Sequence, residues 1–182
     1  MNTYNVIQLG NPKLRLISEP FTHDEFGTEN LKTLADNLIK IMMAEKGIGL
    51  AAPQIGLNKR ALAFGMNQHP IRTDLPSIPF TVLFNPSYEP TTDVLVEEYE
   101  GCLSVGKLRA KVPRYKSIYY KGYDAEGRLI EQEVSDVYAR VIQHELDHLN
   151  GVMFLDKVTD YGSLGFHEEL IASGALTSGK TG

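Results

Sequence analysis

The pentapeptide His144-Glu145-Leu146-Asp147-His148 has the residue types and the spacing of a site for metal-assisted hydrolysis. On a helix, His144 and His148 lie one turn apart on the same face, so both imidazoles reach one metal ion. Glu145 lies about 100° around the helix from His144, where its carboxylate stands beside the ion and can take a proton from water. The alternative is a helix with two unrelated histidines. A chain with five histidines forms this pattern by chance with a probability on the order of one per cent.

The motif supplies two ligands, whereas a catalytic metal ion usually has three protein ligands and one open position. Downstream of His148, the next residue able to serve as a third ligand is Asp156. Upstream, Cys102 is the single thiol of the chain. A lone cysteine is most often an ordinary buried residue, so the motif and the thiol by themselves leave the third ligand open.

A glycine-rich segment at residues 47–54 formally fits the dinucleotide-binding pattern G-x-G-x-x-A. That pattern requires a preceding strand and a following helix, whereas here a predicted helix precedes it and Pro53 interrupts any helix that begins there. We therefore expect Gly47 and Gly49 to let the backbone approach a ligand closely, with the Gln54 amide as a nearby donor. A simple polar loop is the alternative for Gln54.

Two predicted helices flank the middle of the chain. Residues 29–45 carry apolar side chains at spacings of three and four, which predicts an amphipathic helix that stops near Gly47. A second helix, over residues 137–150, is capped by Ser135 or Asp136 and ended by Asn150-Gly151. Because apolar residues cover much of its circumference, we expect this second helix, which carries the histidine motif, to be largely buried.

Between the helices, β-prone runs predict strands at residues 61–65, 80–86, 93–100 and 117–123, and a turn leads to a return strand that ends near Val134. This order predicts an α+β domain in which antiparallel β-sheets pack around the central buried helix, with the amphipathic helix on the N-terminal side. The long loop at residues 66–79 is expected either to border a ligand groove or to be a surface excursion.

The composition limits the size of the protein and its partners. At 182 residues and 42% hydrophobic content, the chain predicts one domain at residues 1–172 and a flexible tail at 173–182 rich in Gly, Ser and Thr. A net charge of −5 argues against nucleic acid and anionic membranes as partners. The single cysteine, the missing secretory pattern and the lack of a long apolar run together predict a cytoplasmic protein.

Three segments together resemble one family, the peptide deformylases: GIGLAAPQ at residues 47–54, EGCLS at 100–104 and QHELDH at 143–148. They follow in the order and at the spacing of that family's signature blocks, and the resemblance extends from about residue 6 to residue 157. It implies a metallohydrolase that removes the formyl group from the N-terminal methionine of newly synthesised proteins and releases formate. The implied substrates are N-formylmethionyl nascent peptides.

The resemblance also implies a metal site. By similarity, Cys102, His144 and His148 hold one divalent ion, which is Fe²⁺ in the usual cellular form, with Zn²⁺, Ni²⁺ or Co²⁺ able to replace it. The chemistry of the side chains alone predicts only a site of thiolate and imidazole ligands.

Further roles follow from the same resemblance. Glu145 would move the proton, while the side-chain amide of Gln54 and the backbone N–H of Leu103 would donate hydrogen bonds to the oxyanion. Backbone near Gly49 and Gly101 would pair with the extended peptide, and an apolar pocket would take the methionine side chain. By their positions in the motifs, the substrate-binding residues would be Ile48, Gly49, Gly101, Val137 and Val141.

The chain departs from the family pattern in two places. Val105-Gly106 stands where many deformylases have an aliphatic residue and then proline, which predicts a looser loop. Some relatives carry a basic C-terminal helix that docks on the ribosome, but the end of this chain is short and scarcely basic, so we expect no ribosome binding through it. Arg109 and Arg114 are expected to orient the peptide or to neutralise Glu100 or Asp147, with plain surface arginines as the alternative.

Two other functions remain open on the sequence. A His-Glu-x-x-His metalloprotease would share the water-activation step but would need a different third ligand and an open cleft. A binding protein with a purely structural metal would have four ligands and no open position. Cys102 separates the deformylase from the protease, because only the deformylase resemblance makes it a ligand.

Overall fold

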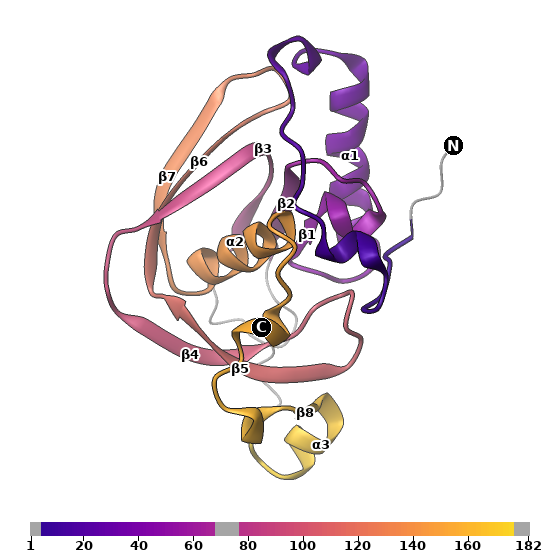
Figure 1. Ribbon diagram of the computed structural model, residues 1–182. Helices are drawn as coiled ribbons and strands as arrows, with labels where there is room; N and C mark the ends of the chain where they lie inside the picture. Colours follow the sequence, from indigo (N-terminus) through magenta and orange to yellow (C-terminus); the bar gives the residue numbers. More distant parts are fainter. Residues whose placement is uncertain (1–4, 68–76, 177–182) are drawn as a thin grey trace.

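The computed structural model describes residues 5–67 and 77–176, which form two antiparallel sheets and three α-helices (Figure 1). The larger sheet contains, in spatial order, β1 (Gly49–Ala51), β2 (Ala61–Met66), β3 (Ile78–Pro90), β6 (Ser117–Tyr123) and β7 (Leu129–Ser135). The smaller sheet contains β4 (Leu95–Glu100), β5 (Leu108–Tyr115) and β8 (Gly165–Phe166). The helices are α1 (Glu29–Ala44), α2 (Asp136–Leu149) and α3 (His167–Ala172). The predicted α+β class, with antiparallel sheets and few helices, is confirmed.

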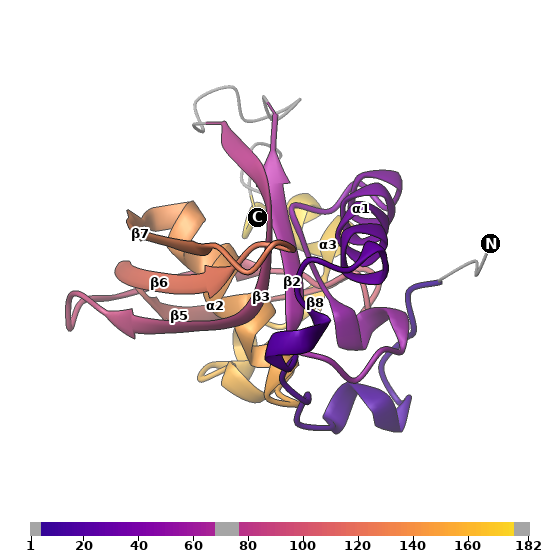
Figure 2. The same ribbon diagram turned by 90° about the horizontal axis from the view of Figure 1, so that it is seen from above.

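Strand β2 separates two parts of the hydrophobic core, because successive side chains of a strand point to opposite faces of the sheet. Leu62 and Phe64 pack in the cluster that includes the buried side chains of α2. Ala61 and Ala63 pack in the cluster that includes α1, where small side chains leave room for the helix. Figure 2 shows the result, with α1 and α2 on opposite sides of β2 and β3.

Helix α1 covers the outer face of this sheet. It begins where the Thr28 hydroxyl accepts a hydrogen bond from the N–H of Leu31, a typical N-cap. Its buried side chains recur at spacings of three and four: Leu31, Leu34, Leu38 and Met42. The helix therefore buries a single stripe and leaves its other face to solvent.

Helix α2 is the central element, and Figure 1 shows it between the larger sheet and the β4–β5 pair. Every residue from position 139 to position 149 is buried. The helix ends at Asn150, after which Gly151 adopts a left-handed backbone with a φ of 71°. A Cβ at this glycine would lie 2.6 Å from the carbonyl oxygen of Arg15, so glycine allows the N-terminal segment to pack against the helix end.

Strand β5 was not expected from the sequence. Its inward-facing side chains are Ala110, Val112 and Arg114, and the last of these breaks the apolar alternation that predicts a strand. Pro113 also argues against a strand in general, but it sits in the register opposite Glu97 of β4. Because of this buried charge and this proline, the sequence pattern did not predict strand β5.

The C-terminal end of the described chain packs against the rest of the protein. Strand β8 pairs with β5, and α3 follows it directly. Leu176 is only 2% exposed, and its backbone N–H donates to the carbonyl oxygen of Leu170. Leu176 of the predicted tail is thus packed and residues 173–175 are exposed, while residues 177–182 and most of the 66–79 loop lie outside the described residues.

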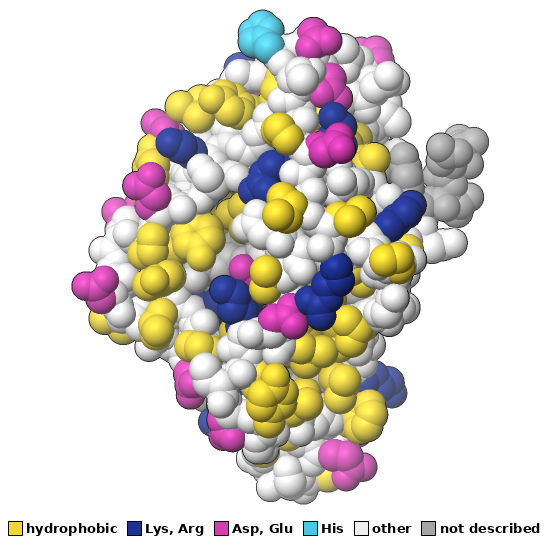
Figure 3. Space-filling view, in the orientation of Figure 1, with side chains coloured by type: hydrophobic (Ala, Val, Ile, Leu, Met, Phe, Trp, Pro, Cys, Tyr) yellow, Lys and Arg dark blue, Asp and Glu magenta, His cyan; other side chains and the backbone are white. Residues whose placement is uncertain are grey.

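None of the described helices is long and apolar enough to cross a membrane. The face shown in Figure 3 carries acidic and basic side chains next to one another, with apolar side chains between them. On this face, charge is therefore mixed rather than gathered into a field of one sign.

Candidate metal centre and active site

Three potential ligand atoms converge beside α2. Cys102, His144 and His148 are buried and each offers one ligand atom, all within 4.8 Å of one another. The two imidazoles come from successive turns of α2, with ring centroids 5.0 Å apart. Cys102 follows the end of β4 and places its Sγ 3.2 Å from Nε2 of His148. The helix and the smaller sheet thus meet at these three side chains.

These residues fit a single divalent cation. Nδ1 of His144 contacts the Glu100 carboxylate at 2.9 Å, which leaves Nε2 of that ring for the centre. Burial lowers the pKa of His148 well below its ordinary value, and the positive charge of Arg114 lowers it further. His148 is therefore neutral, which is the form that binds metal. A thiolate with two imidazoles suits Fe²⁺, Zn²⁺, Co²⁺ and Ni²⁺.

Glu145 lies next to the three ligands without contributing to them. It is buried, and its Oε2 has no hydrogen-bond partner among the described residues. Burial is the main cause that raises the pKa of Glu145 to about 7, although the charge of His144 acts in the opposite direction. A carboxyl group with a pKa near neutrality is well placed both to accept and to return a proton.

Gly49 of β1 makes room for this carboxylate. A Cβ at position 49 would lie 2.2 Å from Oε1 of Glu145, which is far closer than two such atoms can approach. The strand pairs with β2 at this residue, so its backbone cannot move away without breaking the sheet. The sequence placed Gly49 near a ligand, and the structure shows that its nearest neighbour is the side chain of Glu145.

Gln54 stands on the other side of the thiol, in the 3₁₀ turn Ala52–Ile55. Its Oε1 accepts the N–H of Ala51 at 2.8 Å, which directs Nε2 toward Cys102 Sγ at 3.4 Å and Ser104 Oγ at 3.2 Å. The backbone N–H of Leu103 donates no hydrogen bond to another described residue. Two donors therefore lie around the thiol, one of them without a partner in this part of the chain.

A cavity of about 390 Å³ opens beside these groups. The residues predicted to bind substrate all line it: Ile48, Gly49, Gly101, Val137 and Val141. The cavity is also lined by Gln54, Cys102, Leu103, His144 and Glu145. His148 does not line it. The structure thus brings the predicted residues together at one cavity.

A profile of the polypeptide deformylase family matches residues 3–163. The chain belongs to the peptide deformylase family. It is 41% identical to peptide deformylase 1 of Nitrosomonas europaea and 39% identical to peptide deformylase 1 of Bordetella pertussis. Each comparison extends over 165 residues, which are 91% of this chain and 93% of the relative. Peptide deformylases hydrolyse N-formylmethionyl peptides, and the chain is an enzyme of this class.

Solved deformylase structures share the fold. The structure of a class I type b peptide deformylase from Acinetobacter baumannii with bound Met-Ala-Ser aligns with a TM-score of 0.82 at 31% identity, covering 87% of this chain and 100% of the relative. The peptide deformylase of Thermotoga maritima aligns with a TM-score of 0.76 at the same identity, covering 88% of this chain. The two sheets and the helices described above are therefore the deformylase fold.

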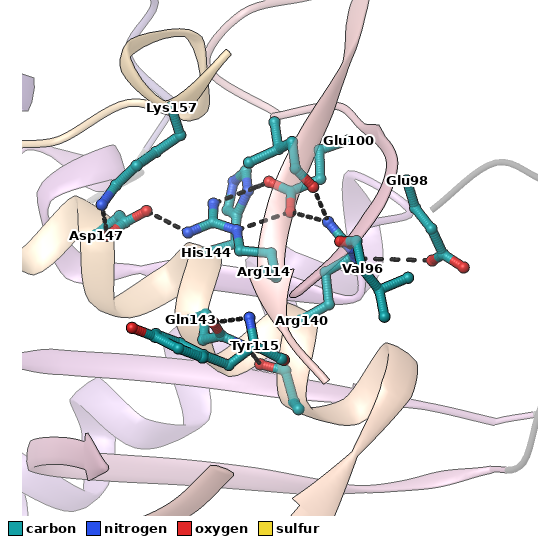
Figure 4. A network of polar contacts seen from close by, with 12 residues as sticks. Val96, Glu98, Glu100, Arg114, Tyr115, Arg140, Gln143, His144, Asp147 and Lys157 are labelled. Atoms are coloured by element: carbon teal, nitrogen blue, oxygen red, sulfur yellow. Dashed lines mark hydrogen bonds and ion pairs between the residues drawn. The ribbon is translucent and has the colours of Figure 1, made fainter. Parts of the chain in front are cut away.

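Glu100, which contacts His144, belongs to a buried ion network (Figure 4). Arg114 is 4% exposed and donates to both oxygens of Glu100 at 2.9 Å, and it also contacts Asp147. The surface alternative for Arg114 was therefore wrong. Burial would raise the pKa of Glu100, but the charge and hydrogen bonds of Arg114, with those of His144, hold it well below its usual range.

Two other arginines lie near these residues. Arg109 lines the cavity, but it donates to the backbone oxygens of Gly106 and Leu108 rather than to a carboxylate. Arg140, to which the sequence assigned no role, is buried and contacts Glu100 at 2.7 Å. Its position one turn before His144 is the signal that could have placed it near the site.

Proposed function

We propose that Cys102, His144 and His148 hold one divalent ion, Fe²⁺ in the cell, with Zn²⁺, Ni²⁺ or Co²⁺ able to replace it. We further propose that the substrate is the formyl-methionine end of nascent chains in the cytoplasm. The observation that carries this proposal is the convergence of three potential ligand atoms within 4.8 Å of one another, near a buried carboxylate oxygen that has no partner in the described part of the chain. When bound, such an ion supplies Lewis acidity, which polarises a carbonyl group and lowers the pKa of water.

Glu145 is proposed as the general base and then the general acid. Its carboxylate takes a proton from the water molecule whose oxygen bonds to the formyl carbon. It then returns the proton to the nitrogen of the methionine as the C–N bond breaks, so that formate and a free amine leave. A pKa of about 7 allows Glu145 to perform both transfers near neutral pH.

Gln54 and Leu103 are proposed to stabilise the oxyanion that forms on the formyl group. The N–H of Leu103, which has no partner among the residues that the structure describes, and the Nε2 of Gln54 both belong to residues that line the cavity beside Cys102. Because the Gln54 carbonyl is fixed by Ala51, its amide cannot turn its acceptor toward the oxyanion. Donors held in place before the reaction stabilise the developing charge without reorganising.

The substrate peptide is proposed to lie extended in the cavity. Ile48, Val137 and Val141 supply an apolar wall for the methionine side chain, and backbone at Gly49 and Gly101 pairs with the peptide chain. The Met-Ala-Ser peptide in the similar Acinetobacter structure is a methionyl peptide of the kind that loss of formate leaves. Pairing through backbone would accept many sequences after the first residue.

Formate release from a formyl-Met-Ala peptide tests the proposal. Protein purified without oxygen and loaded with Fe²⁺ should release formate, and Glu145→Ala should do so about 10²- to 10⁴-fold more slowly while retaining its metal. Equal rates would remove Glu145 from the reaction. Metal analysis of both proteins shows whether a loss of rate reflects the missing carboxylate or a missing ion.

A further inference from the structure

Arg140 occupies an unusual place for a charged side chain. It is 7% exposed and lies on α2 one turn before His144, so the two side chains share a face of the helix. Its guanidinium donates to the backbone oxygens of Val96 in β4 and Val112 in β5, at 2.6 and 2.9 Å. It also donates to Oε1 of Glu100 at 2.7 Å. Arg140 therefore contacts the helix, both long strands of the smaller sheet and the carboxylate behind the metal centre.

The Glu100 carboxylate has each of its oxygens doubly occupied. Oε1 accepts from Nε of Arg114 and from Arg140, while Oε2 accepts from Nη2 of Arg114 and contacts Nδ1 of His144 (Figure 4). Arg114 by itself holds the carboxylate in one plane as a bidentate pair. Arg140 adds a second donor on Oε1, so two arginines hold the carboxylate that contacts His144.

The orientation of His144 depends on this carboxylate. Nδ1 of His144 contacts Glu100, whereas Nδ1 of His148 has no hydrogen-bond partner among the described residues. A partner on the outer nitrogen fixes the rotation of a metal-binding imidazole and the nitrogen that carries the proton. In the described chain, Glu100 thus provides this support for one of the two histidines.

We propose that Arg140 is a positioning residue of the metal centre: through Glu100, it fixes the orientation of the His144 imidazole. This inference rests on the proposed metal site. Without Arg140, Arg114 still neutralises Glu100, so the carboxylate stays charged and buried but loses one of the contacts that fix its direction. The expected consequence is weaker metal binding by about 10- to 100-fold, as for other supports of metal ligands.

Cobalt-loaded protein provides the test, because the visible absorption of Co²⁺ reports the ligand geometry directly. Arg140→Met should alter the Co²⁺ spectrum and accelerate the loss of Co²⁺ to a chelator by about 10- to 100-fold. Arg140→Lys keeps the charge but cannot reach two strands and Glu100 together, so it should show a smaller change of the same kind. If Arg140→Met does not fold, the lysine variant decides.

Arg60→Met is the matched control for a purely structural role. Arg60 also ties the end of α2 to a strand, through the backbone oxygens of Leu149 and Pro86, but it does not contact Glu100. It should lower thermal stability while leaving the Co²⁺ spectrum and the rate of loss unchanged. An unchanged spectrum and rate in the Arg140 variants, or an equal change in Arg60→Met, would overturn the inference. Failure of the wild-type protein to bind Co²⁺ would instead overturn the proposed metal site.

Discussion

Cys102 places a soft sulfur atom beside two imidazoles that one helix provides. The periodicity of α2 alone puts His144 and His148 on one face, whereas Cys102 lies in the turn between β4 and β5. The spacing of His144 and His148 therefore predicted that both could bind one metal ion, whereas Cys102 became a candidate only because its segment resembles a block of the family. Its role as a ligand remains a proposal that its geometry supports.

The Cys102→Ala variant should lose its metal. Removing one of three ligands leaves two imidazoles, and we expect the metal content after gel filtration to fall from about one ion per chain to a small fraction. His23→Ala, which removes an exposed histidine far from the thiol in the sequence, should retain the ion. Normal metal content in Cys102→Ala would show that a residue other than Cys102 is the third ligand, as the protease alternative requires.

Gly49→Ala should slow catalysis by displacing Glu145. The added Cβ would fall 2.2 Å from the carboxylate oxygen, so the side chain must move by about 1 Å, which typically costs about 10²-fold in kcat. Metal content should remain unchanged. Adding Gly49→Ala to Glu145→Ala should cost nothing further if the glycine acts through that carboxylate, and a full additional loss would contradict this view.

At the scale of elements, the smaller sheet contains a strand, β5, that the sequence pattern did not predict. Helix α2 follows from apolar periodicity and from the Asn150-Gly151 ending, and both features are local. Strand β5 was missed because Arg114 faces inward, and its burial depends on carboxylates far along the chain, Glu100 and Asp147. Local patterns describe elements that bury apolar groups, but they cannot indicate a buried ion network assembled from several elements.

The left-handed glycines that follow α2 and α3 offer a matched pair of substitutions. Gly151 and Gly174 both have left-handed backbones, but only at Gly151 would a Cβ meet another segment, the backbone of Arg15. Gly174→Ala should lower the free energy of unfolding by about 1 to 2 kcal/mol. Gly151→Ala should lower it by about 2 to 4 kcal/mol. Urea unfolding measures the free energy of unfolding of both variants. Equal losses would show that the N-terminal segment moves away from the added Cβ without a cost in stability.

At the scale of the whole molecule, the N-terminal segment and the segment after α2 are joined by an ion pair between Arg15 and Asp156. Asp156 also accepts the backbone N–H of Met153 at 2.7 Å. Burial would raise the pKa of Asp156, but the hydrogen bond from Arg15 and that from Met153 lower it overall. This carboxylate therefore connects two distant parts of the sequence close to the end of the central helix.

This depressed pKa predicts how the pair responds to acid. Its stabilisation is present above the pKa of the unfolded chain, about 4, and is lost as the pH falls through the lower folded-state value. Because both side chains are partly exposed, Asp156→Asn should cost no more than about 1 kcal/mol at neutral pH. Urea unfolding should show this difference shrinking at about pH 3. A difference that is the same at both pH values would exclude the carboxylate charge as its source.

The placement of Cys102 on one element and of both histidines on another has a consequence for synthesis of the chain. A ribosome makes Cys102 first and completes β5, β6 and β7 before it reaches His144 and His148. The three proposed ligands cannot surround an ion until α2 has formed and docked against the smaller sheet. Insertion of the proposed metal ion is then among the last steps of maturation, and until that step the Cys102 thiol has no ion to protect it from oxidants.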